Sequence, residues 1–137
     1  MNIEQINKAF PKLDTLFAMR LASFIQGCQK IVDAHHTESY PAGSFSPEFI
    51  ESAKSYLQVN SKSRRFIGIF ERDKPTPDYS RGKIFAFVDS TNGDVLMPAG
   101  WKAPAKNGAR GNIFDAANGL TNISWLGVAY KAQAKSI

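Results

Sequence analysis

The stretch KIFAFVDSTNGDVLMPAGWKAPAKNGARGNIF, residues 83–114, decides which fold the sequence predicts. Its first half places successive side chains on opposite faces of a sheet, and the pattern indicates two β-strands joined by a hairpin turn. Asn92-Gly93 is the preferred two-residue type I′ turn, because both central positions need a positive φ. In that register Val88 lies opposite Met97.

The second half of this stretch has neither a helical nor a strand period. Residues 99–111 contain three glycines and one proline, and this composition predicts a long irregular loop after the hairpin. A loop of this length inside a compact domain is commonly functional. It carries Trp101, Lys102, Lys106 and Arg110, so we expect a rigid sheet that holds out a basic, tryptophan-bearing loop.

The clearest element outside the hairpin is a long amphipathic helix. Over residues 11–34, apolar side chains recur at three- and four-residue spacing. A capping box that begins at Asn2 predicts a short helix before it. Ser46 as a cap, with Pro47 at the first helical position, predicts a third helix that ends near Gln58.

Two further strands are predicted around the hairpin. Residues 66–70, FIGIF, are apolar on both faces, as in a central strand. Gly68 inside this strand predicts the close approach of another backbone. Residues 123–130 are apolar enough for a last strand. We expect the long helix to pack on the sheet through Leu21, Phe24 and Cys28, which would meet Ile67, Ile69, Phe85 and Phe87.

These elements predict one α+β domain over residues 1–137, with N-terminal helices packed on one face of a small antiparallel sheet. The helical part is expected over residues 1–60, and the sheet with its basic loop over residues 61–137. The length of 137 residues is close to the commonest size of a single domain.

The chain has a formal net charge of +5, and the excess is unevenly placed. Residues 61–110 carry ten Lys or Arg against five Asp or Glu, whereas residues 1–60 carry five against six. A basic patch on the sheet and loop favours polyanions such as nucleic acid, an anionic membrane surface or an acidic protein. The alternative is that the charge serves only solubility.

Eight residues are predicted to contact nucleic acid. The cations would neutralise phosphates and release counterions, and Trp101 would stack on a base. The alternative for two of them is structural, with Trp101 buried and Arg110 paired with Asp115 or a helix C-terminus. The predicted nucleic-acid-binding residues are Arg64, Arg65, Lys83, Trp101, Lys102, Lys106, Arg110 and Asn112.

The inventory of catalytic groups is small, and we expect no enzyme. His35-His36, in a loop predicted over residues 35–43, are adjacent and so lack the spacing that lets two rings face one metal ion. Cys28 falls on the apolar stripe of the long helix and is expected in the core. No phosphate-binding glycine motif is present, so neither a metal nor an organic cofactor is predicted.

The single cysteine excludes an internal disulfide and fits a reducing compartment. The first residues lack the basic and apolar regions of a secretory signal. No stretch reaches the roughly 20 apolar residues that span a bilayer. We therefore expect a cytoplasmic protein that does not enter a membrane.

The segment WKAPAKNGARGNIF, residues 101–114, resembles a segment of small uncharacterised bacteriophage and viral proteins that reads W-K-A-P-A-K-x-x-A-R-G-N-I-F. The resemblance covers the hairpin and loop, about a quarter of the chain. It implies a viral or mobile-element origin, with the host-cell cytoplasm as the place of action. It implies no catalytic residue, and it favours a role in handling viral nucleic acid or in binding a host protein.

Two functions from different classes are predicted. The first is a non-enzymatic nucleic-acid-binding protein that contacts single strands through backbone charge and aromatic stacking. The second is a phage protein–protein interaction module, either an inhibitor of a host protein or a virion component. A homo-oligomer is one arrangement that this function allows. Aromatic and Arg-rich segments are also typical interface anchors, so composition does not separate the two.

Overall fold

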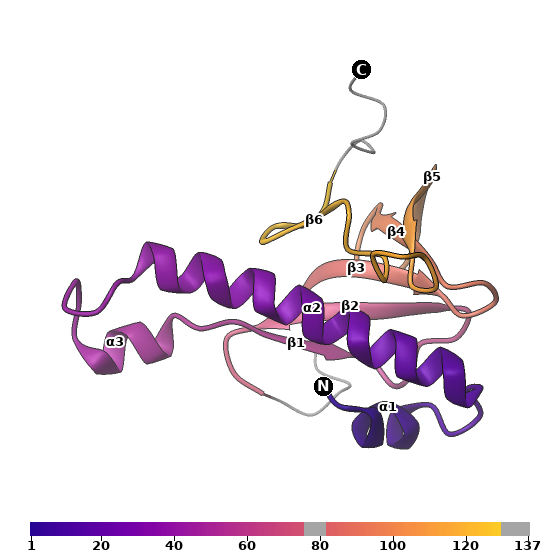
Figure 1. Cartoon of the computed structure of the whole chain (residues 1–137), viewed down its shortest axis with the longest axis horizontal. Helices are drawn as coiled ribbons and strands as arrows, with labels where there is room; N and C mark the ends of the chain where they lie inside the picture. The colour runs from indigo at the N-terminus through magenta and orange to yellow at the C-terminus, as the bar shows by residue number, and fades with distance from the viewer. Residues whose placement is uncertain (76–81, 130–137) are drawn as a thin grey trace.

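A five-stranded antiparallel sheet forms the centre of the structure, and its strands follow one another in chain order, β1-β2-β3-β4-β5. The computed structural model describes residues 1–75 and 82–129. A long helix, α2, crosses one face of the sheet, with α1 beside it (Figure 1). The predicted α+β class is confirmed. The elements are α1 (Ile3–Ala9), α2 (Thr15–Ser39), α3 (Pro47–Ser52), β1 (Tyr56–Val59), β2 (Phe66–Arg72), β3 (Lys83–Asp89), β4 (Asp94–Pro98), β5 (Pro104–Asn112), β6 (Ile123–Ser124) and β7 (Gly127–Val128).

Helix α2 is shifted along the chain relative to the prediction. It begins after Asp14, whose side chain accepts hydrogen bonds from the backbone N–H groups of Leu16 and Phe17. It continues to Ser39, so the predicted loop over residues 35–43 is wrong in its first half. The helix ends at Ser39, two residues before Pro41, because a proline disfavours helical backbone at the residue that precedes it, here Tyr40.

Both predicted caps of the shorter helices are present. Asn2 and Gln5 form the reciprocal capping box of α1, and Ser46 caps α3. Helix α3 ends at Ser52, however, and residues 56–59 form strand β1 instead of extending the helix. The helical part of the chain is therefore shorter than the predicted residues 1–60. No helix in the described ranges combines the length and apolar character needed to cross a membrane.

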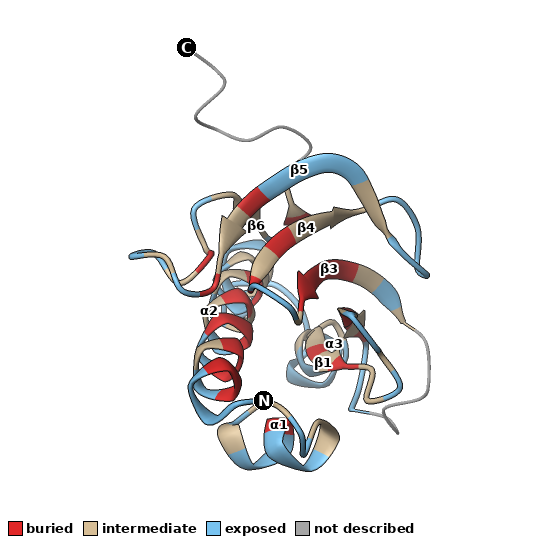
Figure 2. Ribbon diagram, turned by 90° about the vertical axis from the view of Figure 1, so that its right-hand side faces the viewer, coloured by how far each residue is buried: buried red, intermediate tan, exposed pale blue. Residues whose placement is uncertain are grey.

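The core lies between α2 and the sheet (Figure 2). Burial of the apolar side chains of the core removes their surface from water, and each large side chain contributes about 1.5–3 kcal/mol to stability. The predicted helix-to-sheet contacts are confirmed except for Phe87, which is buried outside this cluster. The members that confirm the prediction are Leu21, Phe24 and Cys28 of α2, and Ile67, Ile69 and Phe85 of the sheet.

The turn between β3 and β4 differs from the predicted type I′ turn. Val88 pairs with Val95 and not with Met97, so four residues separate the strands. Asp89 starts the turn, because its carboxylate accepts hydrogen bonds from the backbone N–H and the hydroxyl of Thr91. Only Gly93 in this turn has a positive φ, of 85°. The Asp89 carboxylate accepts the Thr91 N–H that would otherwise pair across the predicted two-residue turn, and the turn is two residues longer than predicted.

The predicted long basic loop is wrong for most of its length. Residues 104–112 form the edge strand β5, which pairs antiparallel with β4. The pairing shifts register twice, and Gly108 has a φ of 92°. These irregularities explain why no alternating pattern is visible in the sequence. Only residues 99–103 remain as the connection between the two strands.

Up to residue 129, the predicted last strand over residues 123–130 is a small hairpin instead, and residue 130 lies outside the described residues. Two two-residue strands, β6 and β7, pair with each other and leave Trp125 and Leu126 exposed at their turn. Trp125 stacks flat on His35 of α2, with 3.7 Å between the ring centroids and 3° between the ring planes. This contact is one of those that join the C-terminal segment to the long helix.

Candidate nucleic-acid interface

A pocket of about 500 Å³ lies on the face of the sheet that is turned away from α2. It combines side chains from the β1–β2 turn, from β2 and β3, and from the β4–β5 connection. We call it the outer-face pocket. Its lining residues are Asn60, Lys62, Ser63, Arg64, Arg65, Phe66, Gly68, Phe70, Phe87, Trp101 and Lys102.

The floor of the outer-face pocket is aromatic. Phe66 and Phe70 come from alternate positions of β2, and Phe87 lies beside them because it pairs with Gly68 across the strands. A Cβ atom at Gly68 would lie 2.8 Å from Cε1 of Phe70 and 3.4 Å from Cε1 of Phe87. The glycine therefore makes room for two aromatic rings, and the predicted approach of another backbone at this position is wrong.

Trp101 forms one wall of the outer-face pocket. It lies on the short β4–β5 connection, which is closed by a hydrogen bond of 3.1 Å from Ala99 N–H to the Ala103 carbonyl oxygen. The Trp101 side chain is not buried, since 48% of the residue is exposed. The Lys102 ammonium lies 5.1 Å from the centroid of its ring. Proteins that bind single strands combine exposed aromatic rings with nearby cations, and Trp101 with Lys102 has this combination.

The β1–β2 turn supplies three cations to the rim: Lys62, Arg64 and Arg65. The turn is shaped by its own polar groups, because Asn60 Oδ1 accepts from Lys62 N–H and Ser63 Oγ accepts from Gly68 N–H. These bonds fix the backbone that carries the exposed residues Lys62 and Arg64. The positive charge of this region therefore lies beside the aromatic floor.

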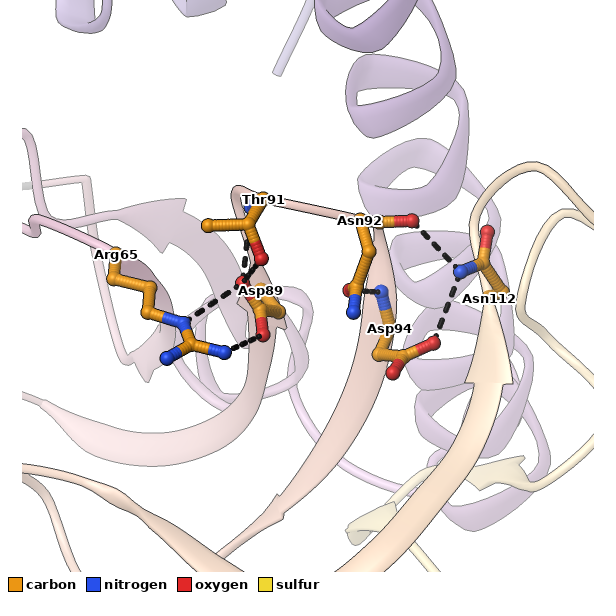
Figure 3. A network of polar contacts seen from close by, with 6 residues as sticks. All are labelled: Arg65, Asp89, Thr91, Asn92, Asp94 and Asn112. Atoms are coloured by element: carbon orange, nitrogen blue, oxygen red, sulfur yellow. Dashed lines mark hydrogen bonds and ion pairs between the residues drawn. The ribbon is translucent and has the colours of Figure 1, made fainter.

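Arg65 is held in a defined orientation (Figure 3). Its Nε and Nη2 atoms donate to the two carboxylate oxygens of Asp89, at 3.3 and 3.0 Å. The guanidinium also lies 4.9 Å from the centroid of the Phe66 ring. A bidentate arginine–carboxylate pair fixes the plane of the guanidinium as well as its position. Arg65 and Phe66 thus form one ordered, stacked surface at the edge of the pocket.

The carboxyl group of Asp89 has a pKa below its usual range. Burial alone would raise this pKa, but hydrogen bonds from Arg65 and Thr91 stabilise the carboxylate and outweigh the effect of burial. The folded protein therefore holds the charged form of Asp89 more firmly than the unfolded chain does.

Stability should consequently fall at acid pH in a manner that depends on Asp89. A lowered folded-state pKa gives stabilisation that is fully present above about pH 4, the usual aspartate value, and is lost as pH falls through the folded-state pKa. Urea unfolding between pH 7 and pH 2 should show this loss in the wild type. Asp89→Asn, which cannot ionise, should show a smaller decrease over the same range, and equal decreases in both proteins would contradict the assignment.

Four of the eight predicted contact residues line the outer-face pocket: Arg64, Arg65, Trp101 and Lys102. Lys83 and Lys106 are exposed but are not among its lining residues. Lys83 lies four residues from Phe87 along β3 and pairs with Glu71 of β2. Lys106 lies on the edge strand β5.

Arg110 is placed inside the protein. It is 5% exposed, and it donates hydrogen bonds to the carbonyl oxygens of Asn107, Gly108 and Ala129 at 3.1, 2.6 and 3.2 Å. The predicted contact of Arg110 with nucleic acid is not compatible with this position. Its guanidinium instead connects β5 to the segment after β7.

Asn112 also has a structural position (Figure 3). Its Nδ2 donates to the Asn92 carbonyl oxygen at 2.9 Å and to Oδ1 of Asp94 at 3.0 Å. These bonds fasten the end of β5 to the β3–β4 turn. We therefore assign Asn112 to the sheet and not to the interface.

Sequence reasoning missed the aromatic floor and one cation of the rim. The signal was present in the central strand, where Phe66, Gly68 and Phe70 alternate with the core residues Ile67 and Ile69. A strand that is apolar on both faces is typical of the centre of a sheet with both faces covered. Its second face instead bears the outer-face pocket. Lys62 was missed because the β1–β2 turn that carries it was not predicted.

The described residues also bear on the alternative chemistries. Within residues 1–75 and 82–129, no group of three His, Cys, Asp or Glu side chains is arranged to hold a metal ion. Cys28 is fully buried in the core, and burial raises the pKa of its thiol. A buried neutral thiol packs as a small apolar group, as the sequence predicted.

Comparisons with known proteins match the chain to a family whose function is unknown. A family model, described as a family of unknown function, matches residues 11–131, a range that contains the whole outer-face pocket. No curated protein and no solved structure matches the chain.

Proposed function

Because the chain belongs to the family of unknown function DUF7717, we propose its function from its own chemistry. It binds single-stranded nucleic acid and catalyses no reaction. One observation supports this most directly: three phenylalanines, a tryptophan and four cations line a single pocket on the face of the sheet that is not covered by α2. Aromatic platforms bordered by Lys and Arg are the usual means of binding unpaired bases and their phosphates together.

Within this proposal, the aromatic and charged groups have separate roles. Phe66 and Trp101 provide the π-faces on which two bases stack, and each stacked base contributes about 1–3 kcal/mol. Lys62, Arg64 and Lys102 neutralise backbone phosphates. Stacking requires that the bases leave a duplex, so the pocket favours single strands over double-stranded nucleic acid.

The Arg65–Asp89 pair keeps this platform in place. The Arg65 side chain is 60% exposed, yet two of its three donor nitrogens are bonded to Asp89 and its guanidinium lies over the Phe66 ring. Guanidinium planes themselves stack on bases. An arginine that is already oriented loses less conformational entropy on binding than a mobile one.

The biological setting follows from the resemblance of residues 101–114 to bacteriophage proteins. We propose a phage-encoded protein that acts on nucleic acid in the cytoplasm of the host cell. The same segment contributes Trp101 and Lys102 to the outer-face pocket.

The test of the proposed function is fluorescence anisotropy with short single-stranded DNA and RNA oligomers over a series of salt concentrations. Binding should be present at low salt and should weaken as salt rises, since phosphate contacts release counterions. Affinity that is absent at low salt, or that does not respond to salt, would reject the proposal.

Removal of the two exposed cations of the β1–β2 turn should lower the salt dependence. For single strands, the slope of log affinity against log salt changes by about 0.7 for each phosphate contact. Lys62→Ala with Arg64→Ala should therefore reduce the slope by about 1.4. The matched control, Lys8→Ala with Lys30→Ala, removes the same charge from the exposed surfaces of α1 and α2. Equal slopes in the two double variants would show that only net charge matters.

A second candidate function, protein–protein interaction, is favoured by a different observation. Tyr40, Phe45 and Phe49 form an aromatic cluster around the start of α3, with ring centroids 4.9–5.8 Å apart. Phe45 and Phe49 are 52% and 46% exposed. Exposed aromatic clusters are common anchors of interfaces. The proposed partner is a host protein or a second copy of the chain.

The two candidates can be separated with the protein as bait in nuclease-treated host lysate. A partner that depends on the cluster should be lost with Phe45→Ser and Phe49→Ser, and should be retained with Lys62→Ala and Arg64→Ala. Sedimentation of the purified protein, with and without the serine substitutions, checks self-association. Retention of every captured protein by the serine variant, together with an unchanged sedimentation profile, would eliminate this candidate.

A further inference from the structure

A second hollow opens beside the outer-face pocket. It has a volume of about 350 Å³ and is formed where the α1–α2 connection meets the sheet. We call it the α1–α2 hollow. The residues that carry the argument are Phe10, Pro11, Lys12, Leu13, Arg64 and Ile67.

The walls of the α1–α2 hollow are apolar and reach the core. Phe10 and Leu13 are partly buried and pack against the core cluster. Ile67, on the core face of β2, is only 1% exposed. The hollow is therefore a depression in the surface of the core, with an aromatic ring among its walls. A flat apolar group would find the same kind of surface here as in the interior.

The mouth of the hollow is positively charged. Lys12 is exposed and lines it together with Arg64. Two acids adjoin the lining residues along the chain, Asp14 near Lys12 and Asp89 next to Ser90, and both are engaged. Asp14 caps α2, and Asp89 is bonded to Arg65 and Thr91. A ligand that is apolar at one end and anionic at the other matches this arrangement.

Arg64 connects the two cavities, since it lines both the outer-face pocket and the α1–α2 hollow. A phosphate bound to Arg64 joins two nucleotides, so one base can enter each of the two cavities. On this basis, and resting on the proposed function, we infer that the α1–α2 hollow is a second base-binding subsite. It takes an unpaired base of the same strand that stacks on Phe66 and Trp101. The strand crosses the rim at Arg64 and is held at the far side by Lys12.

The inference predicts a dependence on oligomer length that amide chemical shifts can follow. A thymidine trinucleotide should shift amides around the outer-face pocket, such as those of Phe66 and Lys102. A thymidine hexanucleotide should shift these and also the amides of Phe10, Lys12 and Ser90. A uridine hexanucleotide provides the corresponding RNA comparison.

The outcomes separate this inference from the proposed function. If the hexanucleotide shifts only the amides of the outer-face pocket, the α1–α2 hollow is not a subsite, and the proposed function stands. If the hexanucleotide shifts neither group, both are wrong. The subsite is supported if the trinucleotide shifts only the amides of the outer-face pocket and the hexanucleotide shifts both groups.

Substitutions in the hollow provide an independent measurement. Phe10→Leu keeps an apolar side chain but removes the ring, and Lys12→Ala removes an exposed charge without disturbing the core. Each should weaken binding of the hexanucleotide about 5-fold or more and leave binding of the trinucleotide unchanged. Phe45→Leu is the control for the loss of a ring elsewhere. Wild-type affinity of both hollow variants for the hexanucleotide would overturn the inference.

Discussion

A protein with Phe66→Ala and Trp101→Ala is expected to lose most of its affinity for single-stranded oligomers at low salt. The two rings are the partly exposed π-faces of the outer-face pocket. Each stacked base contributes about 1–3 kcal/mol, so loss of both contacts should weaken binding by roughly 30-fold to 20,000-fold. Anisotropy titration at fixed low salt measures this change directly.

The same double variant should keep the salt dependence of the wild type, because Lys62, Arg64 and Lys102 remain. This result would distinguish stacking from charge, since the variant with Lys62→Ala and Arg64→Ala should instead show a reduced salt slope. Phe45→Ala with Phe49→Ala removes two exposed rings from the α3 cluster and is the matched control. Circular dichroism first checks that the variant with Phe66→Ala and Trp101→Ala is folded. The proposal fails if the affinity of the folded variant for the oligomers is within twofold of that of this control.

The elements that the sequence predicts well are those in which one local pattern determines the structure. The apolar spacing of α2, the capping box of α1 and the strand over residues 83–89 all fall into this class. In each of them, the residues that decide the conformation lie within a few positions of one another. Tertiary packing in these elements agrees with the local sequence preference and does not override it.

The register of the β3–β4 hairpin depends on contacts of Asp89, which the Asn92-Gly93 turn signal does not include. The carboxylate of Asp89 bonds to Thr91 and also pairs with Arg65, which comes from a different hairpin. A residue 24 positions away therefore helps to fix where the turn begins. Short-range turn preferences cannot include such a contact.

The location of the candidate site could be predicted in part. The charge excess over residues 61–110 falls in the part of the chain that supplies most of the lining of the outer-face pocket. Whether a given side chain reaches that pocket depends on strand register and on which face it occupies. The prediction therefore placed Arg110 at an interface, although it is buried on the paired strand β5 and bonded to the carbonyl oxygen of Ala129.

Replacement of Arg110 should affect stability and not affinity. Arg110→Met keeps the apolar stem but removes every donor, so the carbonyl oxygens of Asn107, Gly108 and Ala129 lose their hydrogen bonds. Hydrogen bonds from a charged group contribute about 1.5–3 kcal/mol each, and they are not additive. We expect the free energy of unfolding to fall by about 2–4 kcal/mol in urea titrations.

The matched control for this substitution lies on the same strand. Lys106→Met removes an exposed charge from β5 and should change the free energy of unfolding by less than about 0.5 kcal/mol. At a temperature where Arg110→Met is folded, its affinity for a thymidine trinucleotide should equal that of the wild type, because Arg110 lies outside the outer-face pocket. Unchanged stability with lost affinity would mean that β5 opens on binding and that Arg110 contacts the strand after all.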